Sequence, residues 1–233
     1  MNETIEHKTG DSVIKDSGKR EEFQTGSRRD TREGKGRFDL FPPLATIAVL
    51  EELSAWQPRI FDVVEKTEQR PEPAFPILRL VFSYMAGNGG FEVLREAAAR
   101  LILVTEAECV PPALVSATCP RTFARLALLF ENGAKKYGEN NWTKGQPQSR
   151  FLDSAMRHLL KHIAGERDES HDIAAIWNLI CAVDQELRVQ QDRLSPEIID
   201  VGPRATRRSY QISALQIDEI LANPVGRILR SRG

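Results

Sequence analysis

The sequence predicts an all-α protein built around a helical bundle, and three observations support this fold class. First, apolar residues recur at every third or fourth position over long segments, most clearly from Pro120 to Tyr137. Second, glycine or proline stands where these patterns stop, as Gly138 does. Third, the alternation of apolar and polar residues that is typical of a half-buried strand is scarce in this chain.

The N-terminal half divides into three predicted segments. Residues 1–22 are polar and charged, so they cannot bury enough apolar surface to offset the entropy lost on ordering, and we expect a flexible tail. Residues 23–56 form a charged, glycine-rich motif segment that closes with two prolines and a helix over residues 44–56. We expect residues 57–119 to form a large helical insertion that carries no chemical motif.

The C-terminal half contains the predicted core, residues 120–195, followed by a basic tail, residues 196–233. Short loops between amphipathic helices favour an antiparallel bundle. The tail is interpreted as a solvated or oligomer-forming arm, with phosphate or nucleic-acid contact as the alternative. The three predicted core helices run over 120–137, from Ser149 or Arg150 to Ile163, and from about Glu169 to Val189.

Composition excludes several classes of protein. Lys and Arg number 32 against 33 Asp and Glu, so no global charge attracts nucleic acid. The three cysteines lie far apart without a C-x-x-C motif, which disfavours a zinc finger or a disulfide scaffold. No apolar run suits a signal peptide or a membrane helix. We therefore expect a protein of the cytoplasm with no membrane contact.

Acidic side chains beside the apolar stripes suggest a metal site. If the helices pack together, Glu131 can meet Glu169 and Asp172, which stand three residues apart at the start of the third helix. Converging carboxylates repel one another unless a cation or a proton relieves the repulsion, and oxygen-rich sites suit Mg²⁺ or Mn²⁺. The alternative is that the pair simply complements the dipole of the helix N-terminus.

Two other features have structural explanations that we prefer. His158 and His162 are four residues apart on one helix, a spacing that can bind zinc, but the H-E-x-x-H pattern is absent and a solvated or hydrogen-bonded pair is expected. Trp177 lies inside an apolar stripe, so we expect a core residue.

Three blocks of the sequence together resemble one family. They are RRDTREGKGRFDLFPP at 28–43, FENGAKKYGENNWTKG at 130–145, and SRFLDSAMRHLLKHIAGERDESHDIAAIWNL at 149–179. In this order they are similar to the dATP/dGTP diphosphohydrolase N-terminal family, which is common in phages and resembles the MazG-like all-α nucleotide pyrophosphohydrolases. The resemblance covers roughly residues 23–190.

The resemblance implies a metal-dependent hydrolase that cleaves a purine deoxynucleoside triphosphate between the α and β phosphates. Its cofactor would be Mg²⁺ (or Mn²⁺), and its location the cytoplasm, of the host if a phage encodes it. The implied roles are catalysis by Glu131, Glu166 and Glu169, substrate binding by Lys35, Arg37, Lys135, Lys136, Asn141, Trp142 and Arg157, and metal binding by Glu131, Glu169 and Asp172.

Three functional hypotheses follow. The first is this pyrophosphohydrolase, working as a homo-oligomer because short helices expose apolar surface. The second is a non-catalytic nucleotide-binding or protein-interaction module that kept the bundle. The third is a phage nucleic-acid-associated protein that uses the basic tail, which the net charge of −1 does not favour.

Overall fold

The computed structural model describes residues 20–56, 75–111 and 114–203. The chain divides into two compact units, residues 1–35 and residues 36–233. In the first unit, strands β1 (Arg20–Glu22) and β2 (Arg28–Asp30) pair antiparallel as a short hairpin, with Glu21 opposite Arg29. The last three residues of the predicted flexible tail 1–22 therefore form a strand.

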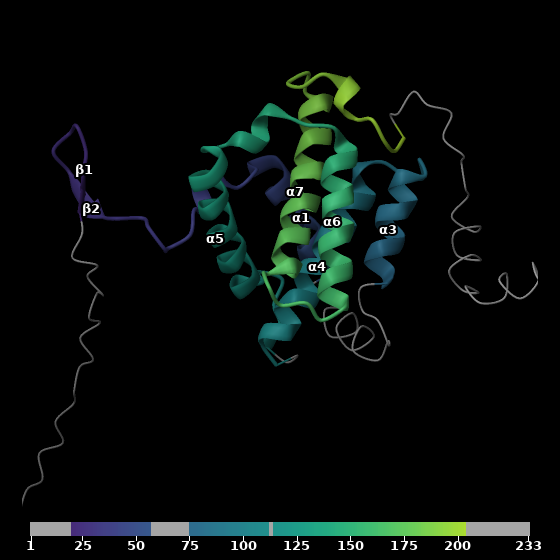
Figure 1. The fold of residues 1–233 in the computed structure, drawn as a ribbon, viewed down its shortest axis with the longest axis horizontal. Coiled ribbons are helices and arrows are strands. Elements are labelled where there is room, and N and C mark those ends of the chain that lie inside the picture. Colours follow the sequence, from purple (N-terminus) through teal and green to yellow (C-terminus); the bar gives the residue numbers. More distant parts are fainter. Residues whose placement is uncertain (1–19, 57–74, 112–113, 204–233) are drawn as a thin grey trace, which may run out of the picture. The chain divides into compact units, whose positions relative to one another are not determined.

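The second unit is helical, which confirms the predicted all-α fold class (Figure 1). Its described elements begin with the 3-10 helix η1 and end with the 3-10 helix η5 (Pro196–Ile198). The elements before η5 are η1 (Phe38–Leu40), α1 (Pro43–Trp56), α3 (Phe75–Met85), α4 (Phe91–Cys109), α5 (Pro120–Tyr137), η4 (Asn141–Lys144), α6 (Gln148–Ile163) and α7 (His171–Gln190).

Helix α7 forms the centre of this unit and packs against α1, α4, α5 and α6 (Figure 1). Its sequence is apolar or small on nearly every face, from Ile173 to Val183, and almost all of it is buried. A helix that is hydrophobic all round requires neighbours on every side, which explains its central place.

Helices α3 and α4 lie in the region predicted as an insertion. Helix α4 packs on α7 and α5, and α3 packs on α4. Buried residues of both helices, such as Ile77, Leu94 and Leu101, belong to the same hydrophobic core as α5, α6 and α7. The described part of the segment 57–119 is therefore part of the main core of this unit.

A carboxylate from α4 caps the start of α5. The side chain of Cys119 at the N-cap has no oxygen and makes no capping hydrogen bond to the first amides of α5. Buried Glu106 accepts instead from the backbone N–H and hydroxyl of Thr122, at 2.8 and 2.7 Å. A negative charge at a helix N-terminus is stabilising, so this contact fixes where α5 begins relative to α4.

Helices α6 and α7 are antiparallel, as predicted, and buried side-chain amides join them at one end. Gln148, the first residue of α6, donates to the Ala182 carbonyl at 3.2 Å and accepts from Gln185 at 2.8 Å. At the other end, His158 lies beside His171. Fully satisfied polar pairs inside a core specify one register, so α6 and α7 cannot easily slide.

None of the helices in the described ranges is both long and apolar enough to cross a membrane. Residues 204–233 of the predicted basic tail and residues 1–19 of the predicted flexible tail lie outside the described residues.

Candidate functional site

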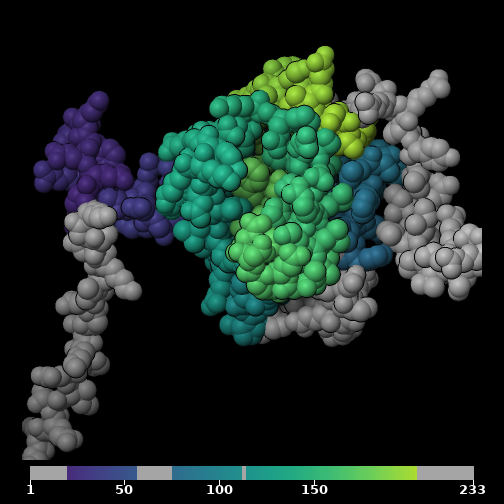
Figure 2. Space-filling view, in the orientation of Figure 1, coloured from purple at the N-terminus to yellow at the C-terminus, as the bar shows by residue number. Residues whose placement is uncertain are grey.

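A surface hollow lies along the C-terminal half of α5. It encloses about 360 Å³ of space, part of which is open to solvent. Figure 2 shows the surface dipping between α5 and the α6–α7 pair. The hollow is mostly apolar, with two amide side chains and one phenol at its edge. Its lining residues are Leu40, Phe130, Gly133, Ala134, Tyr137, Gly138, Asn140, Asn141, Trp142 and Trp177.

Trp142, predicted to bind substrate, is one wall of this hollow. Its indole N–H donates to the carbonyl of Leu40 at 3.2 Å, and the Arg188 guanidinium lies over the ring, 4.9 Å from its centroid. These two contacts fix the ring, because they hold both its edge and one face. Asn141, also predicted to bind substrate, lines the same hollow.

Trp177 has a second role that the sequence did not indicate. It packs against the core, as predicted, between the rings of Phe130 and Phe151, with both centroids 6.1 Å away. It also lines the hollow. An apolar stripe in a sequence cannot distinguish a side chain that is fully enclosed from one that forms the floor of a cleft.

Glu131 follows Phe130, which lines this hollow, and only 5% of the Glu131 residue is exposed. One oxygen accepts from the backbone N–H of Gly36 at 2.9 Å, and the other pairs with Lys135 at 2.9 Å. The predicted residues Glu131 and Lys135 therefore meet, and each already has a partner of opposite polarity.

The other predicted cations lie in different places. Arg37 is buried and forms ion pairs with Asp39 and Glu139, both at 2.6 Å, and these carboxylates raise the pKa of its guanidinium. Lys136 is exposed, with its ammonium 4.9 Å from the Tyr137 ring centroid.

Two further cations predicted to bind substrate form ion pairs with nearby aspartates. Arg157 is exposed on α6 and pairs with Asp153 at 2.6 Å. Lys35 belongs to the first unit and lies 3.5 Å from Asp30.

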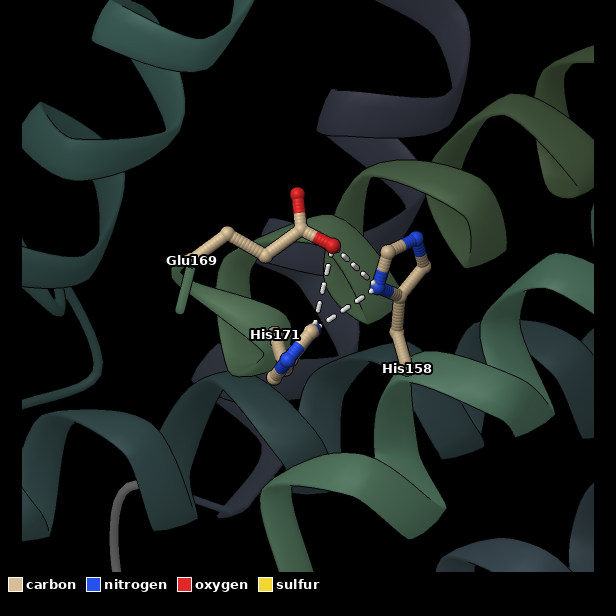
Figure 3. A group of neighbouring side chains, drawn as sticks. All are labelled: His158, Glu169 and His171. Carbon is tan, nitrogen blue, oxygen red and sulfur yellow. Dashed lines mark hydrogen bonds and ion pairs between the residues drawn. The ribbon is translucent and has the colours of Figure 1, made fainter. Parts of the chain in front are cut away.

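A second cluster lies where α6 meets the start of α7 (Figure 3). The Nδ1 atoms of His158 and His171 are 3.1 Å apart. One oxygen of Glu169 lies 3.3 Å from the first and 3.2 Å from the second. Burial lowers the pKa of His158, with Glu169 opposing, so this imidazole is biased towards its neutral form.

Acidic neighbours surround this cluster. Asp168 accepts from Nε2 of His171 at 2.7 Å, and this hydrogen bond lowers the pKa of Asp168. Glu166, predicted to be catalytic, pairs with Lys161 at 3.0 Å, and Lys161 also lies 3.9 Å from Asp168. Lys161 therefore offsets the charge of both carboxylates.

The three predicted metal ligands lie apart. Asp172 faces α5, where both of its oxygens accept from the Arg125 guanidinium at 2.6 and 2.9 Å. Glu131 faces Gly36, and Glu169 faces the histidines. Among the described residues, neither group of side chains that can hold a metal ion includes Glu131 or Asp172. A magnesium ion shared by all three carboxylates does not fit this arrangement.

The two histidines of α6 separate. His162 pairs with Glu108 of α4 at 3.1 Å, and this contact raises the pKa of His162. His158 turns instead towards α7. Each is hydrogen-bonded, as predicted, but His171 was missed as the partner of His158. Equal distance from the connecting loop does not predict this pair, because His171 is the first residue of α7 whereas His158 lies five residues before the end of α6.

Two of the three cysteines do not suit nucleophilic catalysis. Burial raises the pKa of the Cys119 thiol to about 12, with the charge of Glu106 adding to the effect, and burial raises that of Cys181 well above its usual value. A thiol is a weak nucleophile until it ionises, so these two are unreactive near neutral pH.

Residues 105–193 match the sequence model of a family described as dATP/dGTP diphosphohydrolase, N-terminal. The match supports the family resemblance over these residues and links them to dATP/dGTP diphosphohydrolase activity in general. The opening block at 28–43 lies outside it. No curated protein and no solved structure matches the chain.

Proposed function

Proceeding from the family match over residues 105–193, we propose that the protein hydrolyses purine deoxynucleoside triphosphates in the cytoplasm. Water would attack the α phosphorus, the bond from this phosphorus to the bridging oxygen would break, and pyrophosphate would leave. The products would be one deoxynucleoside monophosphate and one pyrophosphate for each water consumed.

One observation carries the proposal. Every residue that lines the hollow, except Leu40, lies inside the segment that matches the family. The hollow and the family signature thus coincide, although the lining residues come from η1, α5, η4, the loop before η4 and α7. An apolar cleft with a few polar groups at its rim is the usual form of a small-molecule site.

The hollow suits the base and sugar of a nucleotide. Trp142 and Tyr137 offer rings against which a base can stack, and the side-chain amides of Asn140 and Asn141 both donate and accept hydrogen bonds. Lys135 and Lys136 in the last turn of α5 place positive charge beside the hollow. Such charge favours the triphosphate electrostatically, and positioning with electrostatics is most of phosphoryl-transfer catalysis.

Dependence on Mg²⁺ or Mn²⁺ is part of the proposal, because a bound divalent ion would neutralise triphosphate charge and acidify a water molecule. Glu131, Glu169 and Asp172 do not supply one shared site for it, since each is held by a different partner. In this proposal the chain itself contributes the hollow and the lysines of α5 to substrate binding.

The test is hydrolysis of dATP, dGTP, dCTP and TTP by the purified chain with Mg²⁺ or Mn²⁺, with chromatographic detection of monophosphate and pyrophosphate. Trp142→Ala should raise KM for the purine substrates about 5- to 150-fold, the loss of one stacked base at about 1–3 kcal/mol. Trp56→Ala is the matched control. Trp56 also carries an arginine over its ring, 5.1 Å from the centroid, but it does not line the hollow.

The outcomes separate the hypotheses. Monophosphate and pyrophosphate from the purine nucleotides, with KM changed by Trp142→Ala and not by Trp56→Ala, would support the proposal. Nucleotide binding without turnover would favour the non-catalytic module.

Exposed apolar side chains on α5, such as Leu128 and Tyr137, favour a homo-oligomer. Light scattering, which measures the mass of the protein in solution, would test this.

A further inference from the structure

The cluster of His158, Glu169 and His171 has the shape of a metal-binding face (Figure 3). Its three nearest atoms, two imidazole nitrogens and one carboxylate oxygen, form a triangle with sides of 3.1, 3.2 and 3.3 Å. Ligands bound at about 2.1 Å stand about 3.0 Å apart at right angles and about 3.4 Å apart in a tetrahedron. All three sides of the triangle lie between these two values, so the spacing of the three atoms is compatible with metal coordination.

Hydrogen bonding assigns a lone pair to the inner histidine. The carboxylate of Asp168 can only accept when ionised, so His171 carries its proton on Nε2, where the two groups are 2.7 Å apart. The Nδ1 atom of a neutral His171 then points a lone pair at Glu169 and His158. A carboxylate behind a histidine in this manner is the usual orienting partner of a metal ligand.

Hydrogen bonds within the cluster cannot satisfy all three atoms. A neutral His158 can supply one proton at Nδ1, whereas Nδ1 of His171 and the oxygen of Glu169 are two acceptors. The contact of 3.2 Å between these two acceptors then has no hydrogen in it. An additional proton or a cation in the triangle relieves this contact.

The neighbouring group of Glu166, Asp168 and His171 is a weaker candidate. Its two carboxylates are already offset by Lys161, at 3.0 and 3.9 Å. The ion pairs of Lys161 are with Glu166 and Asp168, and it acts on Glu169 only through longer-range electrostatics.

We propose that His158, Glu169 and His171 bind a divalent first-row transition-metal ion, with Zn²⁺ held more tightly than Mn²⁺. Two imidazoles and one carboxylate suit these ions, whereas Mg²⁺ prefers a shell of oxygens. The histidine side of the site is largely enclosed, since the His171 side chain is fully buried and that of His158 is 17% exposed. Glu169 is 54% exposed, which leaves an open side for water or a further ligand. This site is independent of the proposed hydrolysis.

The test is calorimetric titration of the untagged, EDTA-treated full chain with Zn²⁺, Mn²⁺ and Mg²⁺. We expect one Zn²⁺ per chain, weaker Mn²⁺ and no stoichiometric Mg²⁺. His158→Gln and Glu169→Gln should each weaken Zn²⁺ at least tenfold, and Asp168→Asn, which removes only the orienting carboxylate, about 10- to 100-fold. His162→Gln, one turn away on the same helix and hydrogen-bonded elsewhere, is the matched control and should bind like the wild type.

Nitrogen NMR of the histidines gives a second reading, because the chain has only four of them. Zinc should shift Nδ1 of His158 and His171 and leave His162 unchanged. The proposal is overturned if the wild type binds neither Zn²⁺ nor Mn²⁺, if His158→Gln and Glu169→Gln bind Zn²⁺ as the wild type does, or if Mg²⁺ binds as tightly as Zn²⁺. The absence of any shift at these nitrogens on addition of zinc would also overturn it.

Discussion

Two glycines that line the hollow should respond in opposite directions to the same added methyl group. Gly133 lies inside α5, and a Cβ at this position would meet no atom within 4 Å. Gly138 follows the helix with φ 87° and ψ 155°, a conformation essentially restricted to glycine. A Cβ there also has open space, so the backbone alone makes the difference.

The magnitudes follow from these conformations. Gly133→Ala should stabilise the protein by about 0.5–1 kcal/mol, because alanine loses less backbone entropy than glycine in a helix. Gly138→Ala should destabilise it by about 1–3 kcal/mol, the cost of holding a side chain in that region. For a domain of this size, 1 kcal/mol moves Tm by about 2–4 °C.

Thermal and urea unfolding of the two variants beside the wild type measures both effects. The expected order of Tm is Gly133→Ala, wild type, Gly138→Ala, with little change in the urea m-value. A destabilised Gly133→Ala, or a Gly138→Ala variant as stable as the wild type, would refute the reasoning from backbone conformation.

A larger side chain at the same helical position tests the hollow itself. Leucine has nearly the helix propensity of alanine, so Gly133→Leu should keep the stability of Gly133→Ala while filling the cleft. If the hollow holds the nucleoside, KM should rise in Gly133→Leu and change little in Gly133→Ala. An unchanged KM in the leucine variant would place the nucleoside elsewhere.

Two further predictions concern contacts between helices. In a double-mutant cycle by urea unfolding, Arg125→Met and Asp172→Asn should show a coupling of about 1–3 kcal/mol, because the carboxylate is buried and the arginine is 35% exposed; additive effects would contradict this. His162 faces Glu108, Asp172 and Arg167, and Glu108 raises its pKa above the unfolded value of about 6.5. This histidine therefore adds stability below pH 6.5 that is lost as pH rises through the folded pKa. His162→Gln should remove this pH dependence of the free energy of unfolding. The effect is under about 1 kcal/mol because Glu108 is half exposed. A variant with the pH profile of the wild type would contradict this assignment.

The helices could be predicted because their periodicity is local. The segment 120–137 agrees with α5, and the predicted third helix, from about Glu169 to Val189, differs from α7 by two residues at its start and one at its end. The predicted site depended on that start. Glu169 and Asp172 share a face only if both are helical, but Ser170 is the N-cap and Glu169 precedes the helix. The spacing rule therefore does not apply to this pair.

Contacts between residues far apart in the sequence could not be predicted from the sequence alone. Arg125 donates to Asp172, and the backbone N–H of Gly36 donates to Glu131. The spacing of residues within one segment predicts neither contact. Acids and histidines crowd in the third block, and the prediction that this block carries chemistry rests on that crowding. Which of them meet depended on the register of α6 against α7.

The geometry of α7 argues for two separate sites on this chain. His171 faces α6, Asp172 faces α5, and Trp177 lines the hollow six residues later, about 9 Å along the helix axis. Six residues also rotate by about 240°, so the triangle and the hollow lie on different faces of one rigid, buried helix. An ion in the triangle therefore does not lie beside a base in the hollow. Once the zinc chelated by free dGTP is accounted for, the zinc affinity of the protein should therefore be the same with and without dGTP, and a changed affinity would contradict two separate sites.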